Sequence, residues 1–286
     1  MKTARTLKNY LYLLPAVVLI GAFFITSIFY TLYLSFYDSD GFSDPVFIGF
    51  DNYVELFTDS NFWISTMNTV IWALSGLIIL VAIPLILAIL ITKSSAPSFF
   101  KNAFYFPNAI SLTIGGLIIS AMLSIYGLPQ IFGYLGLEDM VCNWLAIPYV
   151  NTFIMILSST WQGIGLNLVL FIVGLHNIDS SPIEAARIEG ASPIQMYVKV
   201  VLPLLKSTTV VVMLMSLVNS LKVFDSIWVM TQGGPYRTSE TLALTMYLES
   251  FVRNKMGSGA AVAVVLTVII LIVAYFNIRN TFQKEA

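Results

Sequence analysis

The chain has 286 residues, of which 58% are hydrophobic and only 10% are charged. Soluble domains carry about 25% charged residues, so this composition indicates a protein that folds in a lipid bilayer. The net charge of −1 argues against a nucleic-acid partner, and a single cysteine, Cys142, and a single histidine, His176, exclude an internal disulfide and a metal cluster built from such residues.

Six apolar segments follow one another along the chain, each near the roughly 20 residues that cross about 30 Å of hydrocarbon. They cover residues 11–36, 66–91, 108–126, 152–175, 208–230 and 257–278. We expect an all-α membrane protein with six transmembrane helices, in which residues 11–278 form one domain between the termini 1–10 and 279–286. Three glycines, Gly115, Gly116 and Gly127, interrupt the third segment, which makes it the weakest of the six.

Basic residues gather on one side of these spans. Ten of them flank the first or sixth span or lie in the second–third and fourth–fifth connections: Lys2, Arg5, Lys8, Lys93, Lys101, Arg187, Lys199, Lys206, Arg279 and Lys284. The opposite connections are mainly acidic, and one of them, residues 37–65, predicts a short helix at the membrane interface. Because cytoplasmic loops are enriched in Lys and Arg, we expect a multi-pass protein of the plasma (inner) membrane with both termini in the cytoplasm.

The cytoplasmic connection of residues 179–207, which we call the elbow, contains two similar helix starts. Residues 181–184 (Ser-Pro-Ile-Glu) and 192–195 (Ser-Pro-Ile-Gln) both fit a capping box, with Ser as the N-cap and Glu or Gln as the third helical residue. Gly190 lies between them, where a left-handed residue ends a helix. The sequence therefore predicts two short helices at an angle, presented to a partner at the membrane surface.

The fifth span carries a row of polar side chains. On one helical face, at i, i+3, i+4 and i+7, lie Ser216, Asn219, Ser220 and Val223. A row of hydroxyl and amide groups suits a neutral polyol substrate, and it suits hydrogen bonds between packed helices equally well. On a neighbouring face, Lys222 and Asp225 have the spacing of an ion pair, and we expect them to be structural.

The fourth span contains Ser159, Trp161, Gln162 and Gly163 in its outer half. An aromatic ring beside amides and hydroxyls is typical of sugar-binding surfaces, and the alternative is an interfacial tryptophan beside glycines that allow close packing. Asn108, at the start of the third span, is a weaker candidate because helix capping explains it equally well. No nucleophile–base pair, carboxylate dyad or phosphate-binding glycine loop is visible, so we expect no enzymatic activity in this chain.

A motif in the elbow resembles that of a known family. Glu184-Ala185-Ala186, Gly190-Ala191 and Leu202-Pro203 are similar to the EAA motif of the membrane subunits of binding-protein-dependent ABC importers. Glu189 and Tyr197 stand where that motif usually has aspartate and phenylalanine. Residues 224–235 resemble the segment that follows in the carbohydrate-uptake branch, in its maltose-type and glycerol-3-phosphate-type first permeases. The resemblance covers residues 10–276.

The resemblance implies a role for two groups of residues. The elbow is then the coupling helix that docks on an ATPase subunit, through Glu184, Ala185, Ala186, Glu189, Gly190, Ala191 and Pro203. Glu184 has the additional interpretation that it caps its own helix. Substrate contacts are implied at Asn108, Leu112, Ser159, Gln162, Gly163, Ser216, Asn219, Ser220 and Val223, which include the polar row of the fifth span. No cofactor is expected in this chain, because ATP and Mg bind in the ATPase subunits.

The assembly implied by the resemblance is an ATP-driven sugar importer, with an oligosaccharide as the expected substrate, in a bacterial or archaeal plasma membrane. This chain would form half of the pathway, beside a second homologous permease subunit, two cytoplasmic ATPase subunits and an external solute-binding protein. One alternative is the same machinery with a polyol phosphate or another small solute. The other is an ion-driven secondary transporter, which needs coupling carboxylates within the spans, where only Asp225 fits.

Overall fold

The computed structural model describes residues 12–282, so the predicted N-terminal segment 1–10 and the last four residues lie outside the described part. The chain divides into two compact units. One contains residues 1–62 and 245–268, and the other contains residues 63–244 and 269–286. Helices are the main element of each unit.

The first unit combines an apolar helix with a small cap formed by the segments that follow it. Its elements are the helix Tyr12–Leu34, which contains a π-helical turn (Gly21–Ile25) and α2 (Thr26–Leu34), then β1 (Tyr37–Asp38), β2 (Val46–Phe47), α3 (Asp51–Thr58), a second π-helical turn (Leu248–Val252) and the first part of α15 (Met256–Phe282). The strands β1 and β2 pair antiparallel. Helix α3 is the short helix predicted within residues 37–65.

Side-chain hydrogen bonds hold this cap together. The buried amide of Asn52 donates to the carbonyl oxygens of Ser35 and Tyr37, both at 2.9 Å, and the Tyr53 hydroxyl lies 2.7 Å from the Ser35 hydroxyl. Helix α15 passes β1 so closely that a Cβ at Gly257 would lie 2.0 Å from the Tyr37 carbonyl oxygen. A glycine is therefore required at this crossing.

The connection between β1 and β2 turns around Asp40. The backbone amides of Ser43 and Phe42 donate to its carboxylate at 2.7 and 2.9 Å. These bonds favour the ionised form, so they hold the pKa of the Asp40 carboxyl below its usual value. The turn thus favours an ionised acidic group in the connection between β1 and β2.

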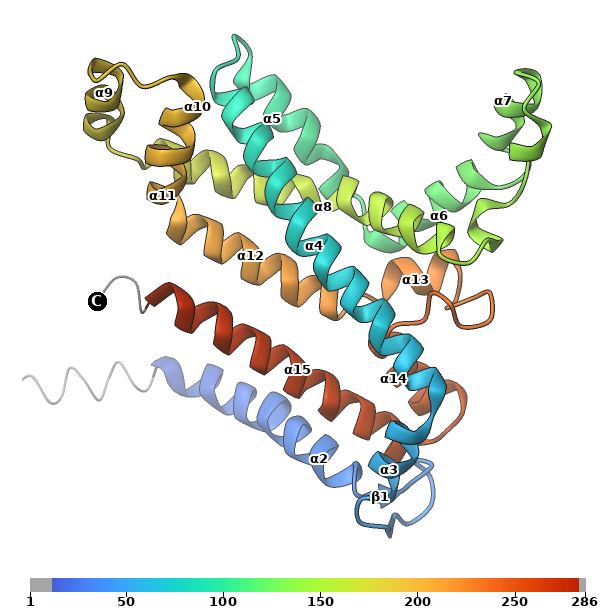
Figure 1. Ribbon diagram of the computed structural model, residues 1–286. Coiled ribbons are helices and arrows are strands. Elements are labelled where there is room, and N and C mark those ends of the chain that lie inside the picture. Colours follow the sequence, from blue (N-terminus) through green and yellow to red (C-terminus); the bar gives the residue numbers. More distant parts are fainter. Residues whose placement is uncertain (1–11, 283–286) are drawn as a thin grey trace, which may run out of the picture. The chain divides into compact units, whose positions relative to one another are not determined.

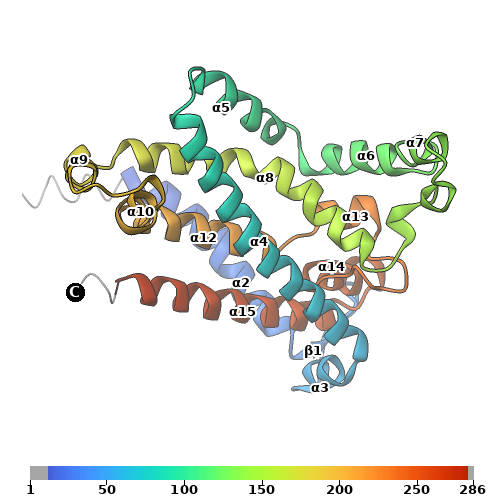
Figure 2. The same ribbon diagram turned by 45° about the horizontal axis from the view of Figure 1, so that its top comes forward.

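The second unit contains most of the predicted membrane spans and the elbow. Its elements are α4 (Ser60–Thr92), α5 (Pro97–Tyr105), a 3-10 turn (Phe106–Ala109), α6 (Leu112–Leu123), α7 (Pro129–Tyr134), two more 3-10 turns (Glu138–Met140 and Trp144–Ala146), α8 (Val150–His176), α9 (Ser180–Ile188), α10 (Pro193–Met196), a π-helical turn (Tyr197–Val201), α11 (Leu202–Leu204), α12 (Lys206–Leu221), α13 (Asp225–Met230) and the start of α14 (Leu242–Tyr247). Helices α8 and α12 lie side by side and α4 crosses both (Figures 1 and 2).

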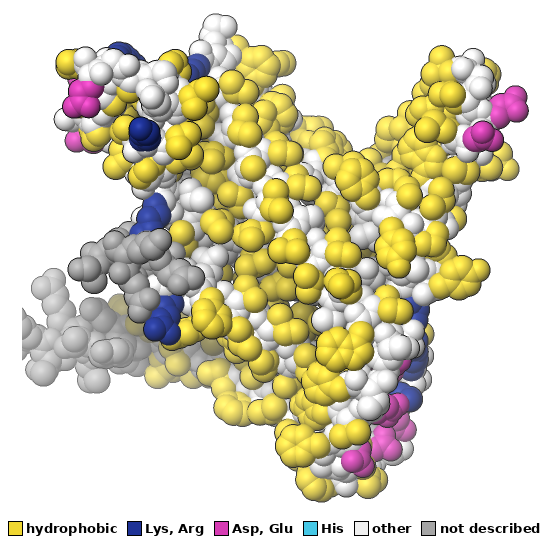
Figure 3. Space-filling view, in the orientation of Figure 1, with side chains coloured by type: hydrophobic (Ala, Val, Ile, Leu, Met, Phe, Trp, Pro, Cys, Tyr) yellow, Lys and Arg dark blue, Asp and Glu magenta, His cyan; other side chains and the backbone are white. Residues whose placement is uncertain are grey.

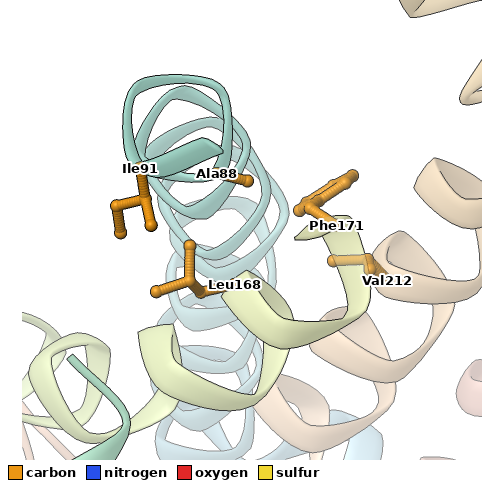
Figure 4. Packing of buried hydrophobic residues seen from close by; sticks show 5 residues of the cluster. All are labelled: Ala88, Ile91, Leu168, Phe171 and Val212. Atoms are coloured by element: carbon orange, nitrogen blue, oxygen red, sulfur yellow. The ribbon is translucent and has the colours of Figure 1, made fainter. Parts of the chain in front are cut away.

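A hydrophobic cluster fixes this three-helix crossing. Ala88 and Ile91 of α4 pack with Leu168 and Phe171 of α8 and with Val212 of α12, and all five are buried (Figure 4). Small Ala88 lets the larger rings and chains of α8 approach α4. The cluster therefore joins the helices predicted as the second, fourth and fifth spans.

A proline within α4 is compensated by a side chain from α8. Pro84 lacks the N–H that would bond the carbonyl oxygen of Leu80 one turn earlier. The amide nitrogen of Asn167 donates to this carbonyl at 2.7 Å and to the Ser216 hydroxyl of α12 at 2.9 Å. In a bilayer, an unpaired backbone carbonyl is costly, and neighbouring helices are the usual source of a donor. Asn167 therefore closes the gap in α4 and links three helices.

Four helices in the described part are long and apolar enough to cross a membrane: Tyr12–Leu34, Ser60–Thr92, Val150–His176 and Met256–Asn277. They correspond to the predicted first, second, fourth and sixth spans. Two further candidates are helix pairs, Pro97–Ala109 with Leu112–Leu123 and Pro193–Leu204 with Lys206–Leu221, which bend by 93° and 73°. Counting each pair as one span gives up to six, in agreement with the predicted number.

The predicted bounds of the third and fifth spans are wrong. Within 108–126, only α6 is a regular helix, because the chain is extended at Ile110 and at the N-cap Ser111. Within 208–230, α12 ends at Leu221, and residues 222–224 separate it from the short α13. A 16-residue helix is about 24 Å long, which is less than the hydrocarbon thickness.

The glycines of the third span allow close packing and do not break the helix. Gly115 and Gly116 are buried inside α6. A Cβ at Gly115 would lie 2.3 Å from the side-chain nitrogen of Gln162 in α8, so this glycine lets α6 and α8 approach. Gly127 lies beyond the helix end, in a turn where a Cβ would meet the Met122 carbonyl oxygen at 2.2 Å.

Charged side chains of the second unit collect at its two ends. In Figure 3, Lys, Arg, Asp and Glu side chains cluster on the α9–α10 end, and acidic side chains lie at the tip of the α7 lobe. The surface of this unit between those ends is largely hydrophobic on the face shown. This distribution suits a unit that spans a bilayer between two aqueous sides.

Candidate functional site

A cavity of about 340 Å³ lies within the second unit. Its walls come from α4, from the segment around the α5–α6 bend, from α8, from α12 and from the break between α12 and α13. Nine of the ten predicted substrate residues line it: Asn108, Leu112, Ser159, Gln162, Gly163, Ser216, Asn219, Ser220 and Val223. The bend after α5 and the break after α12, which the sequence did not predict, are therefore parts of the cavity wall.

Trp161 is the predicted residue that does not line this cavity. Ser159, Gln162 and Gly163 share the inward face of α8, and the next turn adds Leu166 and Asn167. Trp161 lies on another face of the helix and is 43% exposed. Trp161 is therefore not part of this cavity wall, because the helical period turns its ring away, and the alternative of an interfacial tryptophan fits its exposure.

The α12 wall differs from its prediction at one residue. Ser216, Asn219 and Ser220 share a face of the helix, as predicted. Val223 was placed on the same face by continuing the helix, but α12 ends at Leu221. Val223 nevertheless reaches the cavity from the break, together with Lys222 and Asp225.

Many polar groups of the cavity already bond across helices. The Ser159 hydroxyl lies 2.9 Å from that of Ser226, and the Gln162 amide donates to the Ile110 and Ser111 carbonyl oxygens at 3.2 and 3.3 Å. The Asn108 amide donates to the Gln162 carbonyl oxygen at 3.4 Å. The alternative interpretation of these side chains as links between helices is thus realised in their geometry, and it leaves spare oxygen lone pairs and hydroxyl protons for a ligand.

Asn219 differs from these engaged amides. Asn219 is exposed and lines the cavity, and its side chain makes no hydrogen bond to any other described residue. Lys222 and Asp225 also form no ion pair with each other in the described part of the chain, so the expected structural pair is wrong. The break after Leu221 removes the helical spacing on which that pair depended. The three side chains form a polar edge of the cavity with free hydrogen-bonding capacity.

Helix α4 supplies a wall of the cavity that was not predicted from the sequence. Trp72, Ser75, Gly76 and Leu80 line the cavity at the spacing of one helical face. A Cβ at Gly76 would lie 1.9 Å from the Ser220 hydroxyl oxygen, so this glycine brings α4 against the polar row of α12. The available signal was the Ser75-Gly76 pair inside a strongly apolar span, because small residues mark close helix contacts in membranes.

The first helix of the elbow starts earlier than predicted. Asp179 is the N-cap of α9, and its carboxylate accepts from the Ser181 backbone amide at 3.3 Å. The predicted capping box of Ser181 with Glu184 is therefore wrong, because Asp179, two residues upstream, forms the N-cap and the helix begins at Ser180. Glu184 is exposed on the helix surface and has no capping role.

The end of α9 and the start of α10 confirm the other elbow predictions. Gly190 has φ +79°, and the amides of Gly190 and Ala191 donate to the Arg187 and Ala186 carbonyl oxygens at 3.1 and 3.0 Å, as in a Schellman motif. Ser192 and Gln195 form both bonds of a capping box. The two helices are thus rigidly joined at a tight turn.

The elbow presents an exposed surface built from the predicted residues. Glu184, Ala185, Glu189 and Gly190 are exposed, and Ala186 and Ala191 are half-buried. Ile188 and Ile194 flank the turn and are 87% and 77% exposed. Pro203 lies in α11, just before the 73° bend into α12. Exposed apolar side chains on a capped, rigid turn are suited to docking in a partner surface.

Lys93 and Tyr197 connect the elbow to the end of α4. The Lys93 ammonium lies 4.6 Å from the centre of the Tyr197 ring. His176 closes α8 nearby, with its Nδ1 2.8 Å from the Ile172 carbonyl oxygen, as expected for a helix C-terminal residue. Among the described residues, no group of three or more His, Cys, Asp or Glu side chains could hold a metal ion.

Comparison with known proteins decides the family. The family described as binding-protein-dependent transport system inner membrane component matches residues 85–284. The chain belongs to this family. It is a membrane subunit of a binding-protein-dependent transport system and not an enzyme, since the ATPase resides in partner subunits.

Individual relatives cover nearly the whole chain. A probable ABC transporter permease protein of Pyrococcus horikoshii is 33% identical, over 96% of each chain. The probable starch degradation products transport system permease AmyD of Thermoanaerobacterium thermosulfurigenes is 31% identical, over 99% of this chain and 98% of the relative. Among solved structures, a bacterial ABC transporter involved in the import of alginate superposes with a TM-score of 0.86 over 99% of this chain, at 22% identity. The fold is therefore that of an ABC importer permease.

Proposed function

We propose that this chain is a permease subunit of an ATP-driven oligosaccharide importer, and that the cavity of the second unit is its sugar-binding site. The observation that carries the proposal is the cavity itself. Hydroxyl and amide groups from α8, α12 and the α5–α6 bend line it together with apolar walls. Polar groups that fix hydroxyls, beside apolar surface that covers ring faces, are what a sugar site requires.

The size of the cavity also suits this substrate class. Its volume of about 340 Å³ lies at the lower end of ligand pockets, which span about 300–1,000 Å³. A second, homologous permease would supply the opposite half of the pathway and enlarge the site. The name of AmyD, which refers to starch degradation products, supports an oligosaccharide.

A polyol phosphate is less well supported as the substrate. Among the described residues, Lys222 is the only cationic side chain that lines the cavity, and Asp225 lies in the same wall. A phosphate dianion would meet one cation and one carboxylate, which is a poor electrostatic match. The neutral groups of the cavity favour an uncharged sugar.

The elbow would transmit the force of ATP hydrolysis. We place it in the cytoplasm, with both chain termini, because the basic residues lie on that side. Its exposed turn at Gly190 would dock on one of two ATPase subunits, which hold ATP and Mg. Closure of the ATPases would move α9 and α10 as a rigid body, and the α11–α12 bend at Leu205 would pass that motion to the cavity wall.

Ligand screening of the co-purified solute-binding protein tests the substrate class. Thermal unfolding is measured with maltotriose, raffinose, glycerol 3-phosphate, glutamine and zinc, each as a separate sample. We expect a clear stabilisation by one of the oligosaccharides alone. Stabilisation by glutamine or zinc, with no response to the sugars, would overturn the carbohydrate assignment.

Labelling of the elbow tests the orientation. In a Cys142→Ser background, a single cysteine is placed at the exposed Ser181 position through Ser181→Cys. A membrane-impermeant maleimide should label this variant in opened vesicles and leave it unlabelled in intact cells. Labelling of intact cells from outside would place the elbow on the wrong side for an ATPase.

A further inference from the structure

Trp72 holds a hydrogen-bond donor that the protein itself does not use. Its side chain is 4% exposed and lines the cavity from α4. The indole nitrogen Nε1 is buried and has no hydrogen-bond partner among the described residues. Buried tryptophan N–H groups usually find a partner, because an unmade bond in an apolar surrounding is costly. An unpaired donor in the wall of a binding cavity therefore calls for an explanation.

The surroundings of Trp72 favour a ligand as that partner. The other buried side-chain atom without a partner in the described part, the Ser120 hydroxyl oxygen, belongs to a residue that does not line the cavity. The amides of Gln162 and Asn167, by contrast, are committed to carbonyl oxygens of neighbouring segments. Of the neutral side-chain nitrogens in the wall, those of Trp72 and Asn219 make no hydrogen bond to a described residue, whereas the Asn108 amide makes one.

Trp72 also shares the cavity wall with polar groups that a sugar would need. It shares its helical face with Gly76, which lets α4 touch Ser220 of the predicted substrate row. An indole offers a broad apolar surface for the C–H face of a pyranose, with one donor at its edge for a hydroxyl or ring oxygen. Trp72 therefore places an indole in the cavity wall, where the sequence had suggested Trp161, and its ring is 4% exposed in this conformation.

We propose that Trp72 contacts the transported oligosaccharide and donates its indole N–H to a sugar oxygen. This proposal rests on the sugar-importer function above and adds a residue of α4 to the site. In the conformation described here, neighbouring atoms cover Nε1. The bond therefore forms when the α4 wall opens toward the cavity. A sugar that makes it stabilises the opened wall, because it binds that conformation better than the covered one.

Two matched substitutions test the proposal in the assembled importer. Trp72→Phe removes the N–H and keeps an aromatic ring, and Trp161→Phe makes the same change at a tryptophan outside the cavity. The membrane complex is heated without the binding protein at increasing concentrations of maltotriose, or of raffinose if the ligand screen selects that sugar. The measured quantity is the sugar concentration that gives half of the maximal increase in unfolding temperature. We expect a five- to tenfold increase for Trp72→Phe and less than a twofold change for Trp161→Phe.

The sugar-free complex gives a second readout. Trp72→Phe also removes ring volume at a buried position, so it should lower the unfolding temperature without sugar. Replacement by 3-benzothienylalanine removes only the unpaired donor and should leave this temperature unchanged or raised. A tryptophan with a purely structural role would leave the sugar response intact in both variants. If Trp72→Phe fails to assemble, replacement by 3-benzothienylalanine keeps the bicyclic shape and removes only the N–H, and the same loss of sugar response is expected.

The outcomes separate this proposal from the proposed function. Sugar stabilises the wild type and both variants equally if Trp72 makes no contact, and that result would overturn the inference while the importer function stands. A wild-type complex that responds to glutamine and to neither sugar would overturn the importer function as well. Loss of the sugar response in Trp72→Phe and the benzothienyl variant, with Trp161→Phe normal, would support the inference.

Discussion

The link between Pro84, Leu80 and Asn167 allows a quantitative test of how the cavity is held. Substitution Asn167→Leu removes the donor to the Leu80 carbonyl oxygen at 2.7 Å and to the Ser216 hydroxyl at 2.9 Å. The serine can rebond within its own helix, but the carbonyl cannot, because residue 84 has no N–H. A buried unpaired carbonyl costs about 1–3 kcal/mol. We therefore expect a loss of about 2 kcal/mol in the stability of the assembled complex.

A double-mutant cycle isolates the carbonyl from every other effect. In a Pro84→Ala background, the new backbone N–H bonds the Leu80 carbonyl oxygen, so Asn167→Leu should cost about 1 kcal/mol less than in the wild type. Thermal unfolding followed by tryptophan fluorescence resolves this, since 1 kcal/mol shifts the midpoint by about 2–4 °C in a protein of this size. Asn219→Leu is the matched control, because its amide makes no hydrogen bond to a described residue. Equal losses in both backgrounds would refute the explanation.

Three further predictions concern the elbow, the substrate row and the first unit. Glu184→Lys and Gly190→Val should each uncouple ATPase activity from uptake while the complex still assembles. Valine at position 190 adds about 1–2 kcal/mol of backbone strain at φ +79°, but its Cβ meets no atom within 4 Å. Normal coupled uptake in both variants would contradict the docking role. Asn219→Ala should weaken sugar stabilisation about fivefold, measured as a dose response, with an unchanged unfolding midpoint without sugar. Gly257→Ala should destabilise the complex by about 1–3 kcal/mol, because its methyl would overlap the Tyr37 carbonyl oxygen, and an unshifted midpoint would argue against that contact.

Sequence periodicity and motif spacing predicted much of the site. The helical face that joins Ser216, Asn219 and Ser220 is a local property, and α12 preserves it. Gly190 was also predictable, because a glycine between two helix starts has few other uses than a left-handed cap, and its φ is +79°. These features depend on residues within one or two turns of each other, where the physical rules are simple.

Features that depend on distant segments were not predictable from the chain alone. No local pattern says that α12 stops at Leu221, since Lys222 and Asp225 have an i, i+3 spacing that a continuous helix would also accommodate. The wall formed by Trp72 required knowing that α4 crosses α12, and that crossing depends on Gly76 and Ser220, 144 positions apart in the numbering. Trp161 was a reasonable candidate by composition, but the rotation of α8 against its neighbours turns it away.

The capping error at the elbow has a similar origin. Ser181 and Asp179 are both good N-cap residues, and the choice between them depends on where α8 ends. In the structure, α8 continues to His176, which leaves only three residues before α9 begins at Ser180. The earlier start makes Glu184 free for a partner, which strengthens its proposed coupling role.

The central claim is that ATP hydrolysis in the ATPase subunits, transmitted through the elbow, drives sugar through the cavity of the second unit. The most direct measurement is uptake of maltotriose, or of raffinose if the ligand screen selects it, into proteoliposomes that contain the complete importer and its binding protein. The proposal predicts uptake that requires ATP and the binding protein, that Glu184→Lys abolishes while ATPase activity persists, and that Asn219→Ala weakens. Uptake by this chain alone, driven by an ion gradient without ATP, would contradict it.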